Sequence, residues 1–302
     1  MLLNKVLKDV EIIESKGNLD IEITNISSDS RIVKKDCLFF AIKGYSLDGT
    51  KFINKAIENG ATGIVVDETT EISELAIPDN ITIVKLNNIR HALAICSCNL
   101  YDYPSRKLKL IGVTGTKGKT TSTYMIKSIL EKHGLKVGLI GSISIYIGDK
   151  KLEDTDRTTP ESYKIQETLA MMVKENVEVA ILEVSSQAMK LDRVTGCDFD
   201  IALFTNLSED HISPKEHKDM DDYFNAKLSL LKLAPNIVVN VDNEWTAKVP
   251  SLLPDKHITT FGMKNKADIS MKNIRPSNSS VEFTLVMNGE ENDIKALPLE
   301  LE

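Results

Sequence analysis

Five apolar segments that alternate with helix-like segments constrain the fold more than any other feature of the sequence. They read LKLIGVT, KVGLIGS, VEVAILEVSS, DIALFTN and NIVVNVD, at positions 108–114, 136–142, 177–186, 200–206 and 236–242. Strands that are apolar along nearly their whole length are typical of a parallel sheet covered by helices on both faces. The sequence therefore predicts a doubly wound α/β fold, in which ligands gather beyond the carboxyl ends of the strands.

A smaller α/β unit precedes this sheet. Its expected strands are at 36–42, 62–68 and 81–86, and a helix at about 89–100 closes it. The segment YDYPSRK follows, and its Pro104 and charged residues suit a linker. We therefore predict two domains, residues 1–104 and residues 105–302. Beyond Ile258, the segments ITTFG, DISMKNIRP and VEFTLVMNGE predict antiparallel strands.

Composition and charge limit the classes of function. The 302 residues contain 37 Lys and Arg against 44 Asp and Glu, a net charge of -7, so no general basic field is available for nucleic acid or anionic lipid. No apolar run approaches the ~20 residues of a membrane-spanning helix, and the first residues lack a signal-peptide cleavage site. We expect a cytoplasmic, monomeric protein. Its four cysteines, which we expect to be buried structural residues, are Cys37, Cys96, Cys98 and Cys197.

The segment LKLIGVTGTKGKTTSTYMIKSILEKHG carries the strongest chemical signal. An apolar strand runs into a glycine-rich turn and then an amphipathic helix, which is the setting of a phosphate-binding loop. Glycines let backbone N–H groups approach a triphosphate, Lys119 supplies a positive charge, and Thr120 offers a hydroxyl to Mg²⁺. An ordinary strand-to-helix turn is the alternative, and the joint presence of Gly115, Gly118, Lys119 and Thr120 disfavours it.

The spacing differs from the common GxxxxGK[ST] loop. Instead, GVTGTKGKTT resembles the GTxGKT[ST] loop of the Mur ligases and folylpolyglutamate synthetases, which activate a carboxylate with ATP and then form an amide. Lys117 stands where asparagine is commoner in that family, and its expected contribution is its backbone N–H. The resemblance implies that ATP is bound by Gly115, Thr116, Lys117, Gly118, Lys119, Thr120 and Thr121.

A metal site is indicated by residues of two further segments. Glu183 ends an apolar strand, where a carboxylate is costly unless it lies in solvent or binds a cation. The segment FTNLSEDHISPKEHKDMDDYFNAKLSLLK resembles the family's TNLxxDHLDxHGxMxxYxxAK, which implies that His211 binds a second Mg²⁺ and that Lys227 is carbamylated by CO₂. Taken alone, these two would be a loop histidine and a helix-face lysine. The run is two residues longer here, which leaves the role of His217 open.

Together these resemblances imply a catalytic set and a metal set. The catalytic residues are Lys119, Glu183, His211 and Lys227, and the Mg²⁺ ligands are Thr120, Glu183, His211 and the carbamate on Lys227.

Substrate-binding residues follow from three more resemblances. EVSSxxxxxxR and DRTTPES match family segments that contact the muramoyl-peptide, and ISSDSRIVKKDCLFFAIKGYSLDGTKF resembles the UDP-binding signature of the Mur enzymes that add the third residue. Local alternatives are a helix cap at Thr159 before Pro160, a turn at Asp29–Ser30 and a surface charge at Arg193. The implied residues are Ser28, Ser30, Tyr45, Ser46, Leu47, Arg157, Thr158, Thr159, Ser185, Leu191 and Arg193.

The resemblance implies an ATP-dependent ligase of cytoplasmic peptidoglycan synthesis, on which cell shape and division depend. It would add an amino acid, L-lysine or meso-diaminopimelate, to UDP-MurNAc-L-Ala-D-Glu through an acyl phosphate. In this family an adenine-binding asparagine and a C-terminal amino-acid-binding domain follow the position where LPLELE stands, so we expect an incomplete central domain, no C-terminal domain, and no complete reaction by this chain alone. The alternatives are a folylpolyglutamate synthetase-like ligase and a non-catalytic nucleotide-sugar-binding fragment.

Overall fold

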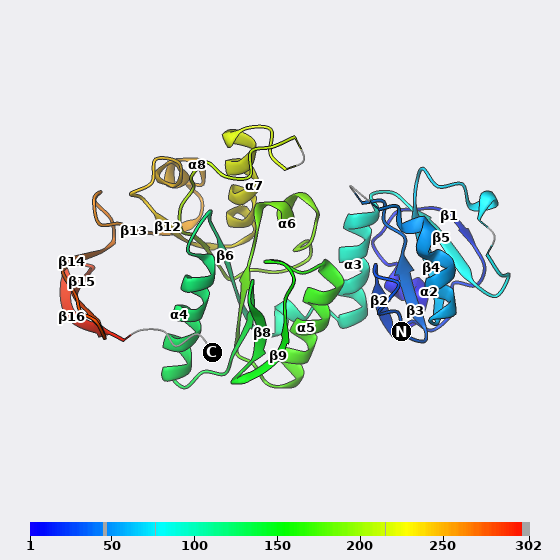
Figure 1. The fold of residues 1–302 in the computed structure, drawn as a ribbon, viewed down its shortest axis with the longest axis horizontal. Coiled ribbons are helices and arrows are strands. Elements are labelled where there is room, and N and C mark those ends of the chain that lie inside the picture. The colour runs from blue at the N-terminus through cyan, green and yellow to red at the C-terminus, as the bar shows by residue number, and fades with distance from the viewer. Residues whose placement is uncertain (45–46, 76, 215, 298–302) are drawn as a thin grey trace. The chain divides into compact units, whose positions relative to one another are not determined.

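The computed structural model describes residues 1–44, 47–75, 77–214 and 216–297 (Figure 1). Contacts between Cα atoms divide these residues into two compact units. Unit 1 contains Met1–Lys107, Pro160–Met171 and Leu191–Cys197, and unit 2 contains the other described residues. No helix in the described part of the chain is long and apolar enough to cross a bilayer.

Unit 1 contains a five-stranded sheet in the order β1-β5-β4-β3-β2. Strands β2, β3, β4 and β5 pair parallel with one another, whereas β1 pairs antiparallel with β5. The strands predicted at 36–42, 62–68 and 81–86 are confirmed as β3, β4 and β5, and the helix predicted at about 89–100 is confirmed as α3. The elements of this unit are α1 Leu3–Val6, β1 Ile12–Lys16, β2 Asn25–Ser27, β3 Cys37–Phe40, η1 Gly49–Phe52, α2 Ile53–Glu58, β4 Ala61–Asp67, η2 Ile72–Glu74, β5 Thr82–Leu86, α3 Ile89–Tyr101 and η3 Pro104–Lys107.

Alternating residues of these strands bury both faces of the sheet. Phe40 packs in a cluster with residues of α1 and α3, and its neighbour Phe39 packs in a second cluster with residues of α2. This two-sided burial explains why the strands are apolar throughout rather than in every second position. The predicted linker after α3 is folded in part, because Pro104 and Ser105 are buried in η3.

Unit 2 is built on an eleven-stranded sheet in the order β16-β15-β14-β13-β12-β11-β6-β10-β7-β8-β9. Its six central strands, β13 to β7 in that order, are parallel to their neighbours, which confirms the predicted doubly wound sheet. The strands are β6 Lys109–Thr114, β7 Val137–Ile140, β8 Ser144–Ile147, β9 Lys150–Asp154, β10 Val179–Glu183, β11 Ile201–Phe204, β12 Asn236–Asn240, β13 His257–Phe261, β14 Ile269–Pro276, β15 Val281–Met287 and β16 Glu290–Ala296.

Helices cover both faces of this central sheet. On one face, Val113 and Ile181 pack with Tyr124 and Ile126 of α4. On the other, a Cβ at Gly112 would lie 2.8 Å from the Phe199 ring and 3.1 Å from Leu230 of α7, so the close approach of α7 requires this glycine. The remaining helices are α4 Lys119–Lys132, α6 Ser186–Lys190, α7 Met220–Leu233, η4 Thr246–Lys248 and α8 Val249–Leu252, together with α5 Ser162–Lys174, of which residues 162–171 belong to unit 1.

Two features of the sheet differ from the expectation. The segment ITTFG was predicted to be antiparallel, but β13 pairs parallel with β12 from His257 to Phe261, and the antiparallel ribbon begins only with β14 (Figure 1). The hairpin of β8 and β9 was not predicted. It extends the other edge of the sheet by antiparallel pairing with β7.

Candidate active site

The predicted phosphate loop joins the end of β6 at Thr114 to the start of α4 at Lys119. Two glycines give it its shape. Gly115 has φ +150°, and a Cβ at this position would lie 1.9 Å from the hydroxyl oxygen of Thr205, so a side chain is excluded. Gly118 has φ +83° and immediately precedes α4, and a Cβ at this position would meet nothing within 4 Å. Glycine is therefore favoured here by the backbone conformation and not by a lack of space.

Side chains from the end of β11 hold this loop in place. Asn206 accepts a hydrogen bond from the Lys117 N–H at 3.0 Å and donates its amide to the Lys117 carbonyl at 2.9 Å. Thr205 donates to the same carbonyl at 2.8 Å. Neither Thr205 nor Asn206 was predicted as a site residue. The loop is therefore braced by the neighbouring strand.

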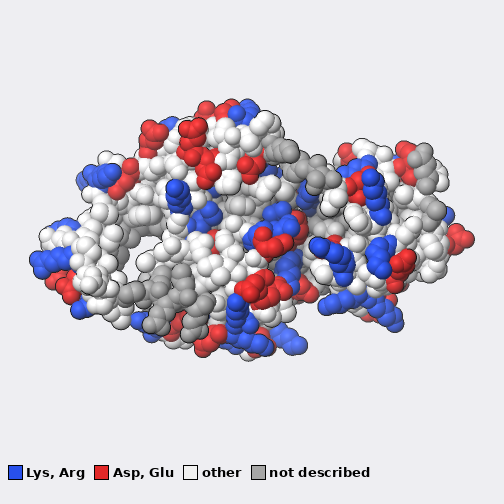
Figure 2. Space-filling model, viewed as in Figure 1, with Lys and Arg blue, Asp and Glu red and all other residues white. Residues whose placement is uncertain are grey.

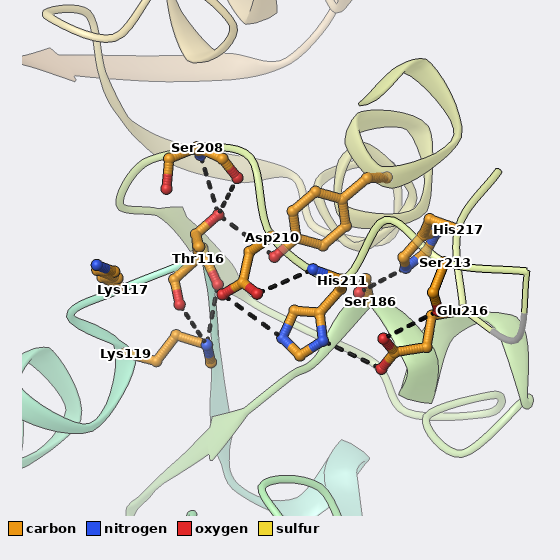
Figure 3. A network of polar contacts seen from close by, with 12 residues as sticks. Thr116, Lys117, Lys119, Ser186, Ser208, Asp210, His211, Ser213, Glu216 and His217 are labelled. Atoms are coloured by element: carbon orange, nitrogen blue, oxygen red, sulfur yellow. Dashed lines mark hydrogen bonds and ion pairs between the residues drawn. The ribbon is translucent and has the colours of Figure 1, made fainter. Parts of the chain in front are cut away.

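Two lysines converge on the carbonyl oxygen of Gly115. Lys119 Nζ donates to it at 2.9 Å and to the Thr116 carbonyl at 3.1 Å (Figure 3), and Lys227 Nζ donates to it at 2.9 Å. Burial lowers the pKa of Lys119, and Glu183 and Asp210 oppose that shift. Burial, followed by the charge of Lys119, lowers the pKa of Lys227 from its ordinary 10.5 to about 7. Lys227 lies on α7, as its alternative of a helix-face lysine requires, but it is only 2% exposed.

Glu183 is fully buried at the carboxyl end of β10, and its carboxylate accepts three hydrogen bonds. Thr120 Oγ1 donates at 3.1 Å, Ser142 Oγ at 3.0 Å and the Ser142 N–H at 3.1 Å. These donors compensate for the loss of water that burial imposes. Thr120 and Glu183, predicted from segments far apart in the sequence, thus meet in space, and Ser142, which was not predicted, joins them.

The oxygen atoms of Thr120 and Glu183 fit a hard cation such as Mg²⁺. His211 has different neighbours, because its ring lies 3.1 Å from Glu216 and 3.9 Å from Asp210 (Figure 3). The His211 side chain is 51% exposed. No group of three or more His, Cys, Asp or Glu residues arranged for a metal is found among the described residues. The predicted set also uses a threonine and a carbamylated lysine, so it stays a prediction.

Predicted substrate residues lie around the same strand end. Thr159 Oγ1 donates to the Glu183 carbonyl at 2.9 Å and accepts from the Ser185 N–H at 3.0 Å. The hydroxyl oxygens of Ser142 and Thr158 lie 3.1 Å apart. The alternative of Thr159 as a helix cap is wrong, because α5 begins only at Ser162. Ser185 instead caps α6, since its Oγ accepts from the Ala188 N–H at 3.1 Å.

The remaining predicted substrate residues differ in exposure. Arg157 is exposed beside Asp156, with Nε at 3.3 Å from its carboxylate. In unit 1, Arg193 is only 8% exposed and its guanidinium lies 2.9 Å from Glu161, so the alternative of a surface charge is wrong. Leu191 and Ser28 are half-buried, Ser30 is buried and Leu47 is exposed, whereas Tyr45 and Ser46 lie outside the described residues.

The turn at Asp29–Ser30 was an alternative to a binding role. Asp29 Oδ1 accepts a hydrogen bond from the Arg31 N–H at 2.9 Å, which is typical of a local turn. Over the visible surface, positive and negative side chains are interspersed on both units (Figure 2). All four cysteines are buried, as expected.

Two family models match the chain. One, described as the Mur ligase middle domain, matches residues 113–299, and the other, described as the Mur ligase family catalytic domain, matches residues 22–98. The chain is 45% identical over 97% of its length to the UDP-N-acetylmuramoyl-L-alanyl-D-glutamate--2,6-diaminopimelate ligase of Clostridium tetani (strain Massachusetts / E88). It spans about 59% of the length of that relative.

Solved structures show the same fold. A UDP-N-acetylmuramoyl-L-alanyl-D-glutamate--2,6-diaminopimelate ligase matches 97% of this chain with a TM-score of 0.78 at 24% identity, and this chain covers 59% of it. An FPGS–AMPPCP complex matches 67% of this chain with a TM-score of 0.56 at 18% identity, and 57% of it is covered. The middle-domain model alone matches more than half of the chain. The chain therefore belongs to the Mur ligase family.

Proposed function

We propose that this chain carries the ATP-binding and UDP-precursor-binding parts of a ligase that adds an amino acid to UDP-MurNAc-L-Ala-D-Glu. The meeting of the glycine loop, Lys119, Thr120 and Glu183 at the carboxyl ends of β6 and β10 carries this proposal. The similarity to the C. tetani diaminopimelate ligase supports meso-diaminopimelate as the amino acid. We further propose a cytoplasmic, monomeric protein of peptidoglycan synthesis, the pathway on which cell shape and division depend.

ATP would bind at the loop of Gly115 to Thr121. Backbone N–H groups at the start of α4 point toward an incoming phosphate, as is general for helix N-termini. Lys119 would exchange its two carbonyl partners for phosphate oxygens, a stronger pairing because both partners are charged. The substrate carboxylate would attack the terminal phosphorus to give an acyl phosphate and ADP. The amine of the amino acid would then form the amide and release phosphate.

We propose that Mg²⁺ binds beside this loop, with Thr120, Glu183 and a carbamate on Lys227 as ligands, and that His211 binds a second Mg²⁺. When bound, Mg²⁺ would offset the charge crowded between triphosphate and carboxylate. The burial of Lys227 suits carbamylation, because CO₂ reacts with an uncharged amine and a pKa of about 7 leaves a large uncharged fraction near neutral pH. The side chain of Lys227 lies 4.6 Å from the centre of the Tyr223 ring, which limits the directions open to it.

The muramoyl-peptide would be bound by residues that already carry well-defined hydrogen bonds. Thr158, Thr159 and Ser185 lie beside Glu183 and are held there by Ser142 and one another. Further contacts are proposed for Arg157, Leu191 and Arg193, and for the UDP part for Ser28, Ser30, Tyr45, Ser46 and Leu47. A folylpolyglutamate synthetase-like ligase is disfavoured, because the FPGS structure matches 67% of this chain and the diaminopimelate ligase structure matches 97%.

Isothermal titration calorimetry with UDP-MurNAc-L-Ala-D-Glu and, separately, with ATP and Mg²⁺ tests the proposal. We expect both ligands to bind, and a folate substrate to give no heat. The assignment is overturned if the folded chain gives no heat with millimolar UDP-precursor. Binding of the folate instead would favour the folylpolyglutamate alternative, and binding of the UDP-precursor without ATP would favour the non-catalytic alternative.

A further inference from the structure

A buried histidine lies within the loop that joins β11 to α7. His217 is 1% exposed, although it comes from a loop in which His211 and Asp210 are half exposed. It lies in the run that is two residues longer than the family segment resembling it. A buried polar ring requires partners for both of its nitrogens, and His217 has both.

The two ring nitrogens join α6 to α7. Nε2 lies 2.9 Å from Ser186 Oγ on α6 (Figure 3). Nδ1 lies 3.0 Å from Asp222 Oδ2 on α7. An ionised carboxylate only accepts hydrogen bonds, so Nδ1 carries the proton and Nε2 accepts from the Ser186 hydroxyl. Lys190 Nζ donates to the same Asp222 oxygen at 2.8 Å, and this contact holds the carboxylate beside His217.

The backbone of His217 closes the loop on itself. Its carbonyl accepts from the Ser213 N–H at 3.0 Å, and its N–H donates to the His211 carbonyl at 3.3 Å. Ile212 and His217 also form an isolated parallel bridge. The position of His211 is therefore tied to the position of His217 by direct main-chain contacts.

Ser186, the partner of His217 Nε2, is the first residue of α6. It directly follows Ser185, whose hydroxyl caps that helix, and Ser185 in turn bonds Thr159 through its N–H. A Ser-His-Asp arrangement also occurs in hydrolases, where the serine attacks a substrate. Here Ser186 is 5% exposed and His217 is 1% exposed, so the arrangement joins elements and presents no nucleophile to a ligand.

We propose that His217 is a positioning residue that holds the backbone of His211 and Ser213 against Ser186, the first residue of α6. His217 thereby fixes the position of His211 relative to Ser185, although the two residues are on different elements. The proposal rests on the proposed function, in which His211 contacts the metal and Ser185 contacts the muramoyl-peptide.

The test compares the parent chain with His217→Ala, His217→Gln and, as a matched control, His257→Ala at an exposed position on β13. Hydrogen exchange of the Ser213 and His217 amides reports the fastening directly, without ligand. Calorimetry with UDP-MurNAc-L-Ala-D-Glu, with ATP plus Mg²⁺ and with ATP plus a chelator reports its effect on the site. Melting curves show at which temperature each variant is folded.

For His217→Ala we expect the two amides to exchange at least about tenfold faster and the UDP-precursor to bind about tenfold more weakly, the scale of one or two lost hydrogen bonds. The Mg²⁺-dependent part of ATP binding should also shrink, whereas binding without metal stays unchanged. Glutamine can place an amide near the position of Nε2, so His217→Gln should restore most of the protection and affinity. The control should match the parent.

Unchanged exchange and affinity in folded His217→Ala would overturn the proposal, as would equal losses in the alanine and glutamine variants. If His217→Ala does not fold, Ser186→Ala removes the same contact and is judged by the same comparison. Failure of the parent to bind the UDP-precursor would contradict the proposed function. The exchange measurement would still decide whether His217 fastens the loop.

Discussion

The carbonyl of Gly115 accepts hydrogen bonds from two lysines, and this shared acceptor explains much of the chemistry of the site. One oxygen partly satisfies both ammonium groups, but it does not remove the repulsion between them. Lys227 is the more buried of the two, so its charge is the more costly one and its pKa falls further. The site thus contains an amine that is poised to lose its proton near neutral pH.

Replacement of Lys227 by methionine tests this environment. The folded state releases the Lys227 proton near pH 7, whereas the unfolded chain keeps it to about pH 10.5, so between these values the unfolded state binds more protons. The free energy of unfolding of the parent therefore gains up to ~1.4 kcal/mol per pH unit from this group as the pH rises. We expect Lys227→Met to lose that contribution, so its stability relative to the parent is greatest near pH 7.

Urea unfolding of both proteins from neutral pH to about pH 9, in buffer free of bicarbonate, measures the difference. Parallel stability curves would mean that Lys227 is solvated and charged throughout.

Lys119 is better fixed than an exposed loop lysine. It donates to two carbonyls of its own loop, so Lys119→Ala should cost about 1 kcal/mol of stability, the net scale of such hydrogen bonds. Its loss should remove most ATP affinity, because no other side chain takes the role proposed for it. Lys117→Ala is the matched control, since Lys117 is exposed on the same loop and holds it through its backbone. Equal ATP affinity in Lys119→Ala and the parent would show that the loop is only a turn.

At the scale of the strand-loop-helix element, the two loop glycines make a matched pair. Gly115→Ala places a Cβ 1.9 Å from the Thr205 hydroxyl oxygen in a left-handed conformation, whereas Gly118→Ala meets nothing within 4 Å. We expect Gly118→Ala to cost ~1–2 kcal/mol of unfolding free energy from its conformation alone, and Gly115→Ala to cost more and to move the loop. Thermal and urea unfolding with ATP titrations provide the measurement. Similar costs for the two variants would contradict the steric argument.

The sequence predicted the central elements well because their signals are local. A buried parallel strand is apolar along its length, and a glycine-rich turn after it indicates a phosphate loop, so β6, β10 and β11 and the contact of Thr120 with Glu183 could be anticipated. The direction of β13 could not be anticipated, because the pattern of ITTFG is the same for a parallel and an antiparallel strand. Only its pairing with β12 shows that it is parallel.

Side chains that act on the site from a neighbouring element were missed for a similar reason. Ser142, Thr205 and Asn206 carry no spacing that marks them, and each is recognised only from the residue it contacts. His217 was noticed in the sequence, but its burial against α6 depends on how the loop closes. The positions of its partners, Ser186 and Asp222, follow from the fold and not from their distance along the chain.

At the scale of the whole molecule, unit 1 is not a continuous stretch of chain. Tyr163 of α5 packs against its core beside residues of α3, and Glu161 lies between Arg90 at 3.7 Å and Arg193 at 2.9 Å. Cys98 also contacts the Thr195 carbonyl. Residues 160–171 and 191–197 thus pack around α3, although they are distant from it in the sequence.

A fragment ending at Lys107 should therefore be less stable than the same residues in the whole chain. It exposes the face of α3 that Tyr163 covers and leaves Arg90 without Glu161, and burial of one aromatic side chain is worth ~1.5–3 kcal/mol. Hydrogen exchange of the α3 amides in fragment and whole chain measures the loss. A longer variant with Tyr163→Ala separates the packing of that ring from the other missing contacts, and equal protection in all three proteins would contradict the prediction.

The place of β6 at the middle of the unit 2 sheet has a consequence for the order in which the protein assembles. Its two neighbours, β10 and β11, bond to it through residues 70 and 91 positions away along the chain. Closing such long loops costs conformational entropy before the strand contacts can stabilise the chain. We therefore expect these pairings to be slow steps in folding. The brace on the phosphate loop comes from β11, and it exists only once that strand has docked. The nucleotide binding proposed for this loop would therefore be acquired late in folding, once these distant pairings are complete.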